Sequence, residues 1–439
     1  MDFQNALNDK QFPIVLELSP VREPQNEENK RKIKEIIDVS GITAISITES
    51  PMGVSAMPPE ELGSFIKNSS NLEVILHLSC KGRNRTQIKS RLESYYRKGL
   101  TNLLVVTGDY PKDSKPVFDL DSVQVLDLIA CLEQKNCGLN NKTISLFAGA
   151  VCSPLHPLQE LQRQKLDLKI QAGARFIVTQ VGYDFARLKL FKERFDKKKY
   201  DVPVLGNIFI PNLKLIDRIF RGEIPGCTIS KGLYNFLSSS SSENILKVYA
   251  WMMNEMRKMG FVGIHLGGPL VQNHQNLKKL LEYFQQLQKY PEEDFYRSIF
   301  YSDDENSNYK IFPTTSFLEK THYQLSSIAH KVLFNGGNKR TRILKKLSFM
   351  EHTVKAALYG CKDCGECTLP DSAFLCPQSG CAKQLLNGPC GGTREGGWCE
   401  VYPTRLCFWV RVALRNPEFK IKFTPPKQWG NIKGSWDTL

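Results

Sequence analysis

A glutamate stands inside a short aliphatic run near the N-terminus, where a charged side chain is unusual. Pro13 and Pro20 bound this run, Ile14–Leu18, and Glu17 lies within it. Aliphatic and β-branched residues bounded by prolines predict a short buried strand. A carboxylate taken out of water is costly unless it is paired, protonated or used. Glu17 is therefore a candidate catalytic acid, and the alternatives are a side chain that turns to solvent or one that pairs with Arg22.

The second group of residues that could do chemistry is a cluster of cysteines. Eight of the 13 cysteines lie near the C-terminus: Cys361, Cys364, Cys367, Cys376, Cys381, Cys390, Cys399 and Cys407. Without a secretion signal, such a cluster indicates a metal site before it indicates disulfides. Eight thiolates are enough for two four-coordinate sites.

The spacing of these cysteines bears on the metal. Cys361, Cys364 and Cys367 are each separated by two residues, and Pro377 follows Cys376. This resembles the ligation of ferredoxins, although the interval before Cys376 is longer than in that motif. Structural zinc more often uses paired Cys-x2-Cys units. The sequence thus favours iron–sulfur clusters, with a zinc ion that holds a small domain together as the alternative.

The elements that must position Glu17 alternate along the chain. Eight short aliphatic runs predict strands: Ile14–Leu18, Ile42–Thr48, Glu73–Ser79, Asn102–Thr107, Thr143–Ala148, Phe176–Gln180, Val202–Ile208 and Phe261–Leu266. Amphipathic segments between them predict helices: Glu27–Ile37, Arg85–Arg97, Ser122–Leu132, Glu160–Ala172, Asp184–Phe195 and Asn244–Lys258. Eight strands that alternate with helices over this length favour a closed (β/α)8 TIM barrel over an open doubly wound sheet.

Polar residues recur where these strands end. They are Glu17, Thr48, Glu49, His77, Ser79, Cys80, Thr107, Gly108, Asp109, Ser153, His156, Gln180, Asn207 and His265. In such barrels the carboxyl ends of the strands carry the active site, so we expect these side chains to surround one site. The chain contains neither a Gly-x-Gly-x-x-Gly fingerprint after a strand nor a phosphate-binding Gly-x-x-x-x-Gly-Lys-Ser/Thr loop.

Length, composition and charge indicate a large domain with an appendage. The 439 residues are 41% hydrophobic and 24% charged, as in ordinary globular proteins. The N-terminus lacks a signal peptide, and no apolar run approaches the roughly 20 residues of a membrane span, so we expect a cytoplasmic protein without a membrane. The net charge is +14, and the chain from Tyr309 onward holds 19 Lys and Arg against 9 Asp and Glu. A basic region of this kind is commonly a solvated face, and it also suits an acidic partner.

The expected domains follow from these patterns. A (β/α)8 barrel would occupy residues 1–290, a polar linker 291–345, a Cys-rich metal-binding domain 346–415 and an extended tail 416–439. A basic zinc module that binds nucleic acid would need a recognisable motif, and Phe408–Arg411 matches one only thinly. We therefore expect no nucleic acid partner.

Six motifs in the first 290 residues resemble those of the methylenetetrahydrofolate reductase family. They occur in the family's order at the spacing of barrel strands: Glu17–Arg22, Ser46–Thr48, His77–Cys80, Gly108–Pro111, Leu155–Pro157, and Lys169–Ala174 followed by Thr179-Gln180. Further motifs resemble the Cys-rich domain that accompanies some bacterial reductases: Tyr359–Cys361, Leu375–Pro377, Asn387–Gly392 and Cys399–Val401. The resemblance thus covers nearly the whole chain outside the linker and the tail.

This resemblance implies a flavoenzyme that reduces 5,10-methylenetetrahydrofolate to 5-methyltetrahydrofolate, in one-carbon metabolism and methyl supply for methionine. Glu17 would be the general acid for opening the imidazolidine ring, and burial would keep it protonated. Asp109 would be the second catalytic carboxylate and would contact both flavin and pterin, and Gln180 would bind the pterin. The residues implied to hold the flavin are Thr48, His77, Gly108, Asp109, Ala150, His156 and Lys169.

Three departures from the family pattern leave the flavin and the electron donor open. Thr107 stands where an Arg usually precedes Gly-Asp, Glu49–Pro51 replaces an aromatic-Gly turn, and Cys152 replaces an aromatic residue. The flavin is expected to be FAD, with FMN as the alternative, and the electron donor is NAD(P)H or a ferredoxin-like protein. A homo-oligomer is left open. The competing function is an accessory electron-transfer or scaffold protein without its own turnover.

Overall fold

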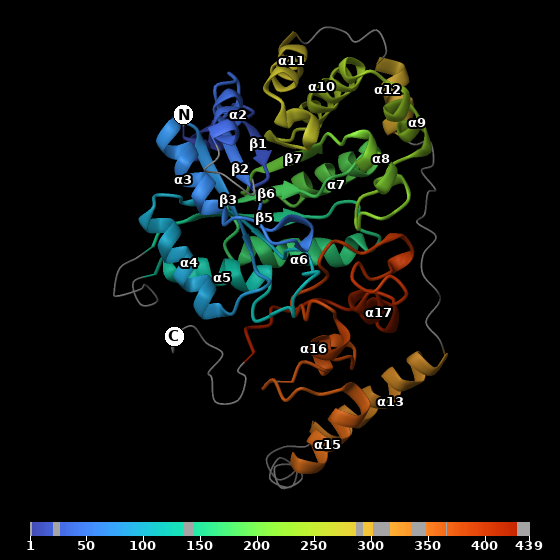
Figure 1. Ribbon diagram of the computed structural model, residues 1–439. Coiled ribbons are helices and arrows are strands. Elements are labelled where there is room, and N and C mark those ends of the chain that lie inside the picture. The colour runs from blue at the N-terminus through green and yellow to red at the C-terminus, as the bar shows by residue number, and fades with distance from the viewer. Residues whose placement is uncertain are drawn as a thin grey trace.

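The computed structural model describes residues 2–20, 27–134, 144–286, 293–301, 317–334, 348–365 and 367–427. Eight parallel strands form a closed barrel in sequence order (Figure 1), which confirms the predicted (β/α)8 fold. The strands are β1 (Ile14–Leu18), β2 (Ala44–Ile47), β3 (Glu73–Ser79), β4 (Asn102–Val106), β5 (Phe147–Cys152), β6 (Phe176–Thr179), β7 (Val204–Phe209) and β8 (Gly263–Gly267). Strands β1 and β8 pair and close the ring, with Val15 opposite His265. Arg22 lies outside the described residues.

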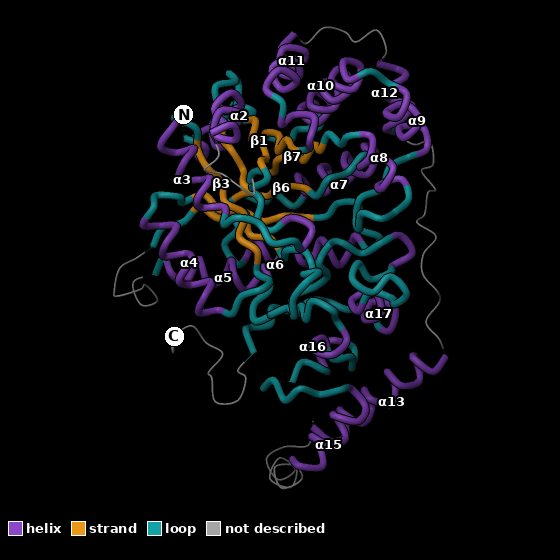
Figure 2. Tube along the Cα trace, in the orientation of Figure 1, coloured by secondary structure: helices purple, strands orange, loops and turns teal. Residues whose placement is uncertain are grey.

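Helices cover the outside of the barrel (Figure 2). They are α2 (Glu27–Ile37), α3 (Pro59–Ser69), α4 (Arg85–Arg97), α5 (Ser122–Leu132), α6 (Gln159–Gln171), α7 (Phe185–Lys197), α8 (Leu213–Phe220), α9 (Lys231–Ser239), α10 (Ser242–Lys258) and α11 (His274–Gln286). Local signals set several of their starts. Asn84 and Asp121 each form a capping box at the N-terminus of α4 and α5, which satisfies backbone N–H groups that the helix itself cannot use.

The amino end of the barrel is closed by apolar side chains. The short helix α1 (Phe3–Asn8) places Phe3 and Leu7 in a buried cluster with strand residues Val15, Leu104 and Phe176. The rings of Phe3 and Phe176 meet edge to face with centroids 5.3 Å apart, a favoured aromatic geometry. The polar strand-end residues expected to form a site therefore lie at the opposite, carboxyl end of the strands.

The position of the fifth strand differs from the prediction. The run Thr143–Ala148 was expected to be the strand, but β5 spans Phe147–Cys152, and Thr143 lies outside the described residues. Phe147 pairs with Asn102 of β4, and the apolar residues before it instead pack near the end of α5, where the Ile144 amide donates to the Leu132 carbonyl. Hydrophobicity alone did not distinguish a strand from a buried connection.

A further helix, α12 (Glu293–Phe300), falls within the range expected to be linker. It buries Tyr296 and Phe300, whose rings lie 5.7 and 5.5 Å from that of Trp251 on α10. These aromatic contacts attach the segment to the helical layer of the barrel. The extent of the linker stays a prediction.

The C-terminal Cys-rich region has little regular structure and lies directly against the barrel. It contains short helices, α16 (Pro377–Gly380) and α17 (Phe408–Arg415), within long loops (Figure 2). Buried polar groups of the barrel form hydrogen bonds with the loops of the Cys-rich region. Asp121 accepts hydrogen bonds from the amides of Leu386 and Asn387 at 3.2 and 2.9 Å, and Lys165 donates to the carbonyls of Gly388 and Pro389 at 3.1 and 2.8 Å.

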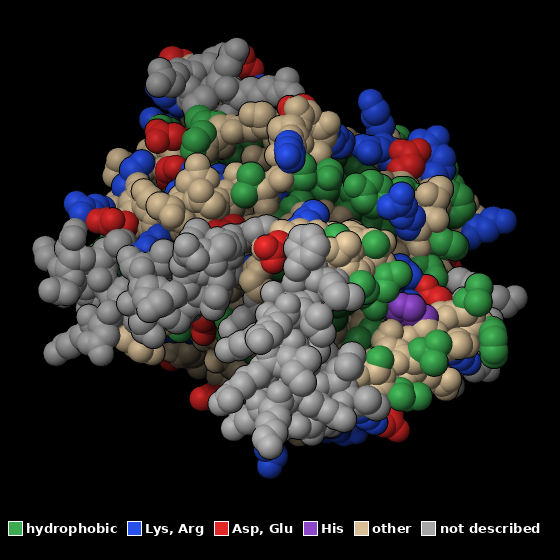
Figure 3. Space-filling view, turned by 90° about the horizontal axis from the view of Figure 1, so that it is seen from below, with side chains coloured by type: hydrophobic (Ala, Val, Ile, Leu, Met, Phe, Trp, Pro, Cys, Tyr) green, Lys and Arg blue, Asp and Glu red, His purple; other side chains and the backbone are tan. Residues whose placement is uncertain are grey.

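Two more helices, α13 (Phe317–Phe334) and α15 (Ser348–Tyr359), extend beside this region (Figure 1). Glu319 of α13 pairs with Arg411 and Arg415 of α17, and Phe317 and Leu318 are exposed. Apolar side chains reach the surface between charged ones on the face seen from below (Figure 3). Among the described helices, none is both long and apolar enough to cross a membrane.

Candidate active site

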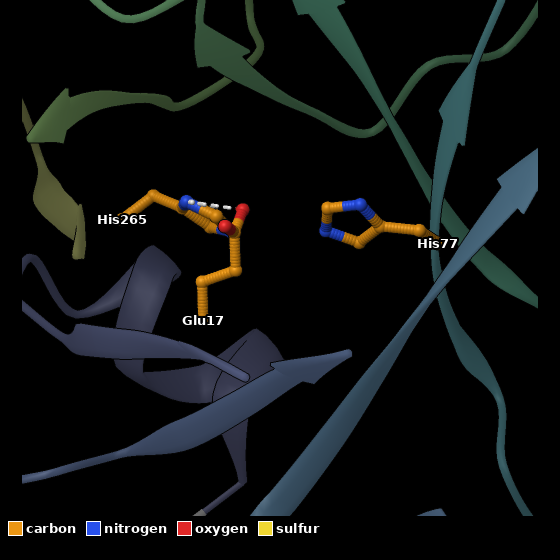
Figure 4. Close-up of side chains that lie close together, drawn as sticks. All are labelled: Glu17, His77 and His265. Atoms are coloured by element: carbon orange, nitrogen blue, oxygen red, sulfur yellow. Dashed lines mark ion pairs between the residues drawn. The ribbon is translucent and has the colours of Figure 1, made fainter. Parts of the chain in front are cut away.

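Three polar side chains converge inside the barrel near the carboxyl ends of its strands. Glu17 comes from β1, His77 from β3 and His265 from β8, and they point toward one another (Figure 4). Within the described ranges they are the one group of three or more His, Cys, Asp or Glu side chains whose ligand atoms all lie within 4.8 Å of one another. Glu17 Oε2 is 3.9 Å from His265 Nδ1, and His77 Nε2 is 2.8 Å from the hydroxyl oxygen of Ser46.

Burial sets the protonation of this group. It raises the pKa of Glu17 to about 7, because a carboxylate loses its hydration there. The pKa of His77 falls to about 3 through burial and, second, through His265, and burial lowers the pKa of His265 to about 4. Both imidazoles are therefore neutral at pH 7, while Glu17 holds its proton to a higher pH than an exposed glutamate does. A group in this condition can donate a proton at physiological pH.

Asp109 lies on the loop after β4 and does not belong to this group. Its carboxylate accepts a hydrogen bond of 2.7 Å from the Met52 amide, and its side chain is exposed. Gly108 precedes it with a φ of +82°, and a Cβ at that position would lie 2.0 Å from the Ser79 hydroxyl oxygen. Only glycine fits this turn, which places Asp109 at the rim of the barrel.

Several residues expected to hold the flavin surround the same end of the barrel with polar atoms unused. Thr48 Oγ1 and His156 Nε2 are buried without hydrogen-bond partners among the described residues. His156 Nδ1 accepts from the Leu158 amide at 2.9 Å, so Nε2 carries the proton of the neutral ring. Buried polar groups without partners are rare in proteins unless a ligand or water satisfies them. A polar ligand such as a flavin fits this donor set.

The remaining expected flavin residues are placed around β5. Ala150 is fully buried in that strand. Lys169 of α6 donates a 2.5 Å hydrogen bond to the Val151 carbonyl, and burial, followed by the charge of Lys165, lowers its pKa to about 7. Lys169 is thus turned toward β5 and held by its carbonyl group.

Gln180 and His156 share a cavity of about 210 Å³ with the C-terminal region. The opposite wall of this cavity includes Arg394, Glu395 and Trp398, and Arg394 also donates to the Gly222 carbonyl at 2.6 Å. Both domains therefore line the space next to the residue expected to bind the pterin.

One strand-end residue has a structural role that its position did not reveal. Glu49 accepts from the Ser79 amide at 2.7 Å and pairs with Arg83 at 2.6 Å and Arg91 at 3.2 Å. Conversely, His265 was noted at a strand end without a role, and it belongs to the central group. The residues that join the C-terminal region to the barrel, Asp121, Lys165 and Lys383, carry no signal in the sequence, since single charged residues in helices and loops are common.

The eight C-terminal cysteines are all free thiols and divide into two sets. Cys361, Cys364, Cys367 and Cys376 line a cavity of about 330 Å³. The other four, Cys381, Cys390, Cys399 and Cys407, line one of about 390 Å³. The second set adjoins the barrel through Gly391, which directly follows Cys390. Its backbone packs so closely on Ser153 of the barrel that a Cβ at Gly391 would lie 2.2 Å from the Ser153 hydroxyl oxygen. Each set offers the four thiols that a metal site needs.

Comparison with known proteins agrees with the sequence motifs. The sequence model of the family described as methylenetetrahydrofolate reductase matches residues 2–260, and the one described as methylene-tetrahydrofolate reductase C terminal matches residues 342–429.

Individual relatives are distant. Methylenetetrahydrofolate reductase 2 of Saccharomyces cerevisiae is 29% identical over 144 residues, 31% of this chain and 23% of that protein. The 5,10-methylenetetrahydrofolate reductase of Pectobacterium carotovorum is 25% identical over 155 residues, 35% of this chain and 49% of the relative. That of Escherichia coli is 24% identical over 151 residues, covering 34% and 48%. The chain thus spans at most about half of these relatives' length.

Among solved structures, an uncharacterized protein from Clostridium thermocellum that binds two copies of 5-methyl-5,6,7,8-tetrahydrofolic acid aligns with a TM-score of 0.48 and 13% identity, over 65% of this chain and 98% of that one. That likeness is too low to bear on function. The family match rests on more than half of the chain and on the barrel that it occupies. The chain belongs to the methylenetetrahydrofolate reductase family.

Proposed function

We propose that this protein is an oxidoreductase that reduces 5,10-methylenetetrahydrofolate to 5-methyltetrahydrofolate with a bound flavin. The observation that carries the proposal is the Glu17 carboxyl, which is half-buried between two neutral imidazoles with its pKa raised to about 7. The reaction needs such an acid, because opening the five-membered ring of the substrate requires a proton on the departing nitrogen.

The chain's own residues would divide the work as follows. Glu17 donates its proton to the departing ring nitrogen, which leaves an iminium at the methylene carbon. A reduced flavin, when bound by the residues named below, would supply the hydride for this carbon. Asp109 at the barrel rim and Gln180 in the adjoining cavity bind and orient the pterin. After product leaves, Glu17 regains a proton from solvent, to which its side chain is about one-fifth exposed (21%).

The residues proposed to hold the flavin are Thr48, His77, Gly108, Asp109, Ala150, His156 and Lys169. The unused buried atoms Thr48 Oγ1 and His156 Nε2 support this assignment, since a flavin offers them hydrogen-bond partners. FAD is the proposed form and FMN the alternative. Extraction of the flavin and separation by liquid chromatography distinguishes the two.

The two cysteine sets are proposed to hold iron–sulfur clusters, with zinc as the alternative. Their soft thiol ligands and the spacing of Cys361, Cys364 and Cys367 along the chain support clusters over single ions. Clusters would supply one-electron transfer beside the barrel. The electron donor is then proposed to be NAD(P)H or a ferredoxin-like protein.

An anaerobic half-reaction assay tests the proposal. The purified holoprotein is mixed with NADH, NADPH or reduced ferredoxin, flavin absorbance is followed, and methylenetetrahydrofolate is added. We expect one donor to bleach the flavin and the folate to restore its colour with formation of 5-methyltetrahydrofolate. A protein without flavin absorbance, or one whose reduced flavin is not reoxidised by the folate, would contradict the proposal.

A further inference from the structure

We propose that His265 is the positioning residue for the proton donor: its Nδ1–H hydrogen-bonds the Glu17 carboxylate that forms when the proton leaves. This inference rests on the proposed function, because it assigns a task within the acid step. It adds a residue for which the sequence suggested no role.

The barrel geometry brings the two side chains together. In the pairing of β1 with β8, Val15 lies opposite His265, so Glu17 follows two residues farther along the neighbouring strand. Both side chains point into the barrel, as alternate strand residues do (Figure 4). Glu17 Oε2 lies 3.9 Å from His265 Nδ1. Catalytic hydrogen bonds are often this long before substrate binds and shorten in the complex.

His265 has no other use for its ring nitrogens among the described residues. Both nitrogens are buried without a hydrogen-bond partner, and the side chain is 3% exposed. A buried imidazole normally satisfies its donor and its acceptor. His77 differs, because its Nε2 already lies 2.8 Å from the Ser46 hydroxyl. The unused His265 therefore has capacity for a partner, and Glu17 is the acidic side chain in its group.

The neutral state of the His265 ring suits this task. The titratable groups that face it are Glu17 and His77, whose ring centroid is 5.9 Å away. Both histidines are neutral at pH 7. A neutral ring does not draw the proton away from Glu17 before substrate arrives, as a fixed cation at that position would. Its N–H still stabilises the carboxylate once the proton has moved.

The step balances without a change at His265. The Glu17 proton goes to the departing nitrogen of the substrate, and the methylene carbon would accept its hydride from the cofactor of the proposed function. His265 keeps its own proton throughout. It lowers the energy of the carboxylate product of the acid step, which makes Glu17 a stronger acid in the complex.

The test compares His265→Leu, His265→Gln and His274→Gln. His274 is a matched control, because its Nδ1 lies 3.1 Å from Glu35 Oε2 on the outer surface. We expect His265→Leu to bind flavin and reduce it at the wild-type rate, but to reduce folate about 10- to 100-fold more slowly. The basic limb of its kcat/KM profile should move to higher pH, since the carboxylate has lost a donor. His265→Gln, whose amide can donate, should recover part of the rate, and His274→Gln should match wild type.

A second readout is independent of turnover. The protonated Glu17 carboxyl is identified by infrared difference spectroscopy as the C=O band absent from Glu17→Gln, and its titration midpoint is measured in the flavin-free protein. We expect a higher midpoint in His265→Leu. If wild type reduces no folate but this shift occurs, the proposed function fails while the pairing of His265 with Glu17 stands.

Two results would overturn the inference. One is an unchanged Glu17 midpoint and an unchanged pH limb in His265→Leu. The other is one equivalent of zinc or iron per chain that is lost in His265→Leu, which would make the two histidines and Glu17 metal ligands. Metal analysis of wild type, His265→Leu, Cys376→Ser and Cys390→Ser separates this outcome from metal held in the C-terminal region.

Discussion

Lys383 of the Cys-rich region donates a hydrogen bond of 3.0 Å to the carbonyl oxygen of Gly108, on the barrel loop that carries Asp109. The same ammonium forms an ion pair with Glu400, whose Oε2 accepts from the thiol of Cys390 at 3.1 Å. The buried Lys383 thus connects the second cysteine set, which contains Cys390, to the loop proposed to bind flavin and pterin. The C-terminal region is in this way part of the wall around the candidate site.

Replacement of Lys383 by Met should weaken ligand binding. The Gly108 carbonyl loses its donor and the loop loses a fixed position, so we expect about a 10-fold rise in the Kd for flavin or the KM for folate. The double variant Lys383→Met/Glu400→Gln removes the carboxylate that would otherwise be left unpaired. Lys422→Met is the control, because Lys422 is 78% exposed and pairs only loosely with Asp371. Equal binding in all variants would contradict the connection.

Folate reduction should decline as pH rises through about 7. Glu17 acts in its protonated form, and its pKa is raised from 4.5 to about 7 by burial, so the acid is present below this value and lost above it. Glu17→Gln should retain flavin reduction and folate binding and lose folate reduction by at least about 100-fold. Stopped-flow half-reactions measure each step separately. Full folate turnover in Glu17→Gln would remove the acid role.

The same pKa shift predicts an effect on stability. The unfolded chain releases the Glu17 proton near pH 4.5 and the folded chain near 7, so the folded state loses relative stability as pH rises between these values. The stability of Glu17→Gln relative to that of wild type should therefore be higher above pH 7 than at pH 4. Thermal denaturation of the flavin-free proteins at both pH values measures this. An equal difference at the two values would show that Glu17 titrates normally.

Asp121 should matter more for stability than an ordinary helix cap. It is 3% exposed, caps α5 through the amides of Val123 and Gln124, and also accepts three hydrogen bonds from Leu386 and Asn387. We expect Asp121→Ala to lower the free energy of unfolding by about 3 kcal/mol, the sum of a lost cap and lost hydrogen bonds to a buried charge.

The control for this change is Asn84→Ala, which removes a cap of α4 that lies at the surface. Its expected cost is about 1 kcal/mol. Urea denaturation followed by tryptophan fluorescence compares the two variants. Equal losses would mean that the contacts of Asp121 with the Cys-rich region add nothing to stability.

The division of the cysteines into two sets predicts separable metal loss. Cys376→Ser and Cys390→Ser lie in different sets, so each should remove about half of the iron and acid-labile sulfide of the anaerobically purified protein, and the double variant nearly all of it. Cys227→Ser changes a buried barrel thiol and should leave the metal content unchanged. Zinc found without acid-labile sulfide would mean that the two sets hold structural zinc ions and no iron–sulfur clusters. Loss of all metal in both single variants would contradict independent sites.

Local sequence signals accounted for much of the barrel. The helices over Glu27–Ile37, Arg85–Arg97 and Ser122–Leu132 match their predicted bounds, because amphipathic periodicity and capping residues act within a few positions along the chain. Strand β5 was misplaced because its ends are set by pairing with β4 and β6 rather than by its own hydrophobicity. Strand bounds depend on neighbours that the local pattern does not contain.

The sequence by itself determined that Glu17 sits in an apolar strand and that eight cysteines are available as ligands, because both follow from residue type and spacing. Only the tertiary structure decided that His265 faces Glu17, since β1 and β8 are about 250 residues apart and meet when the barrel closes. It also decided which cysteines share a cavity and that Lys383 contacts Gly108. Such contacts arise from packing between distant segments, and their energies do not appear in any local pattern.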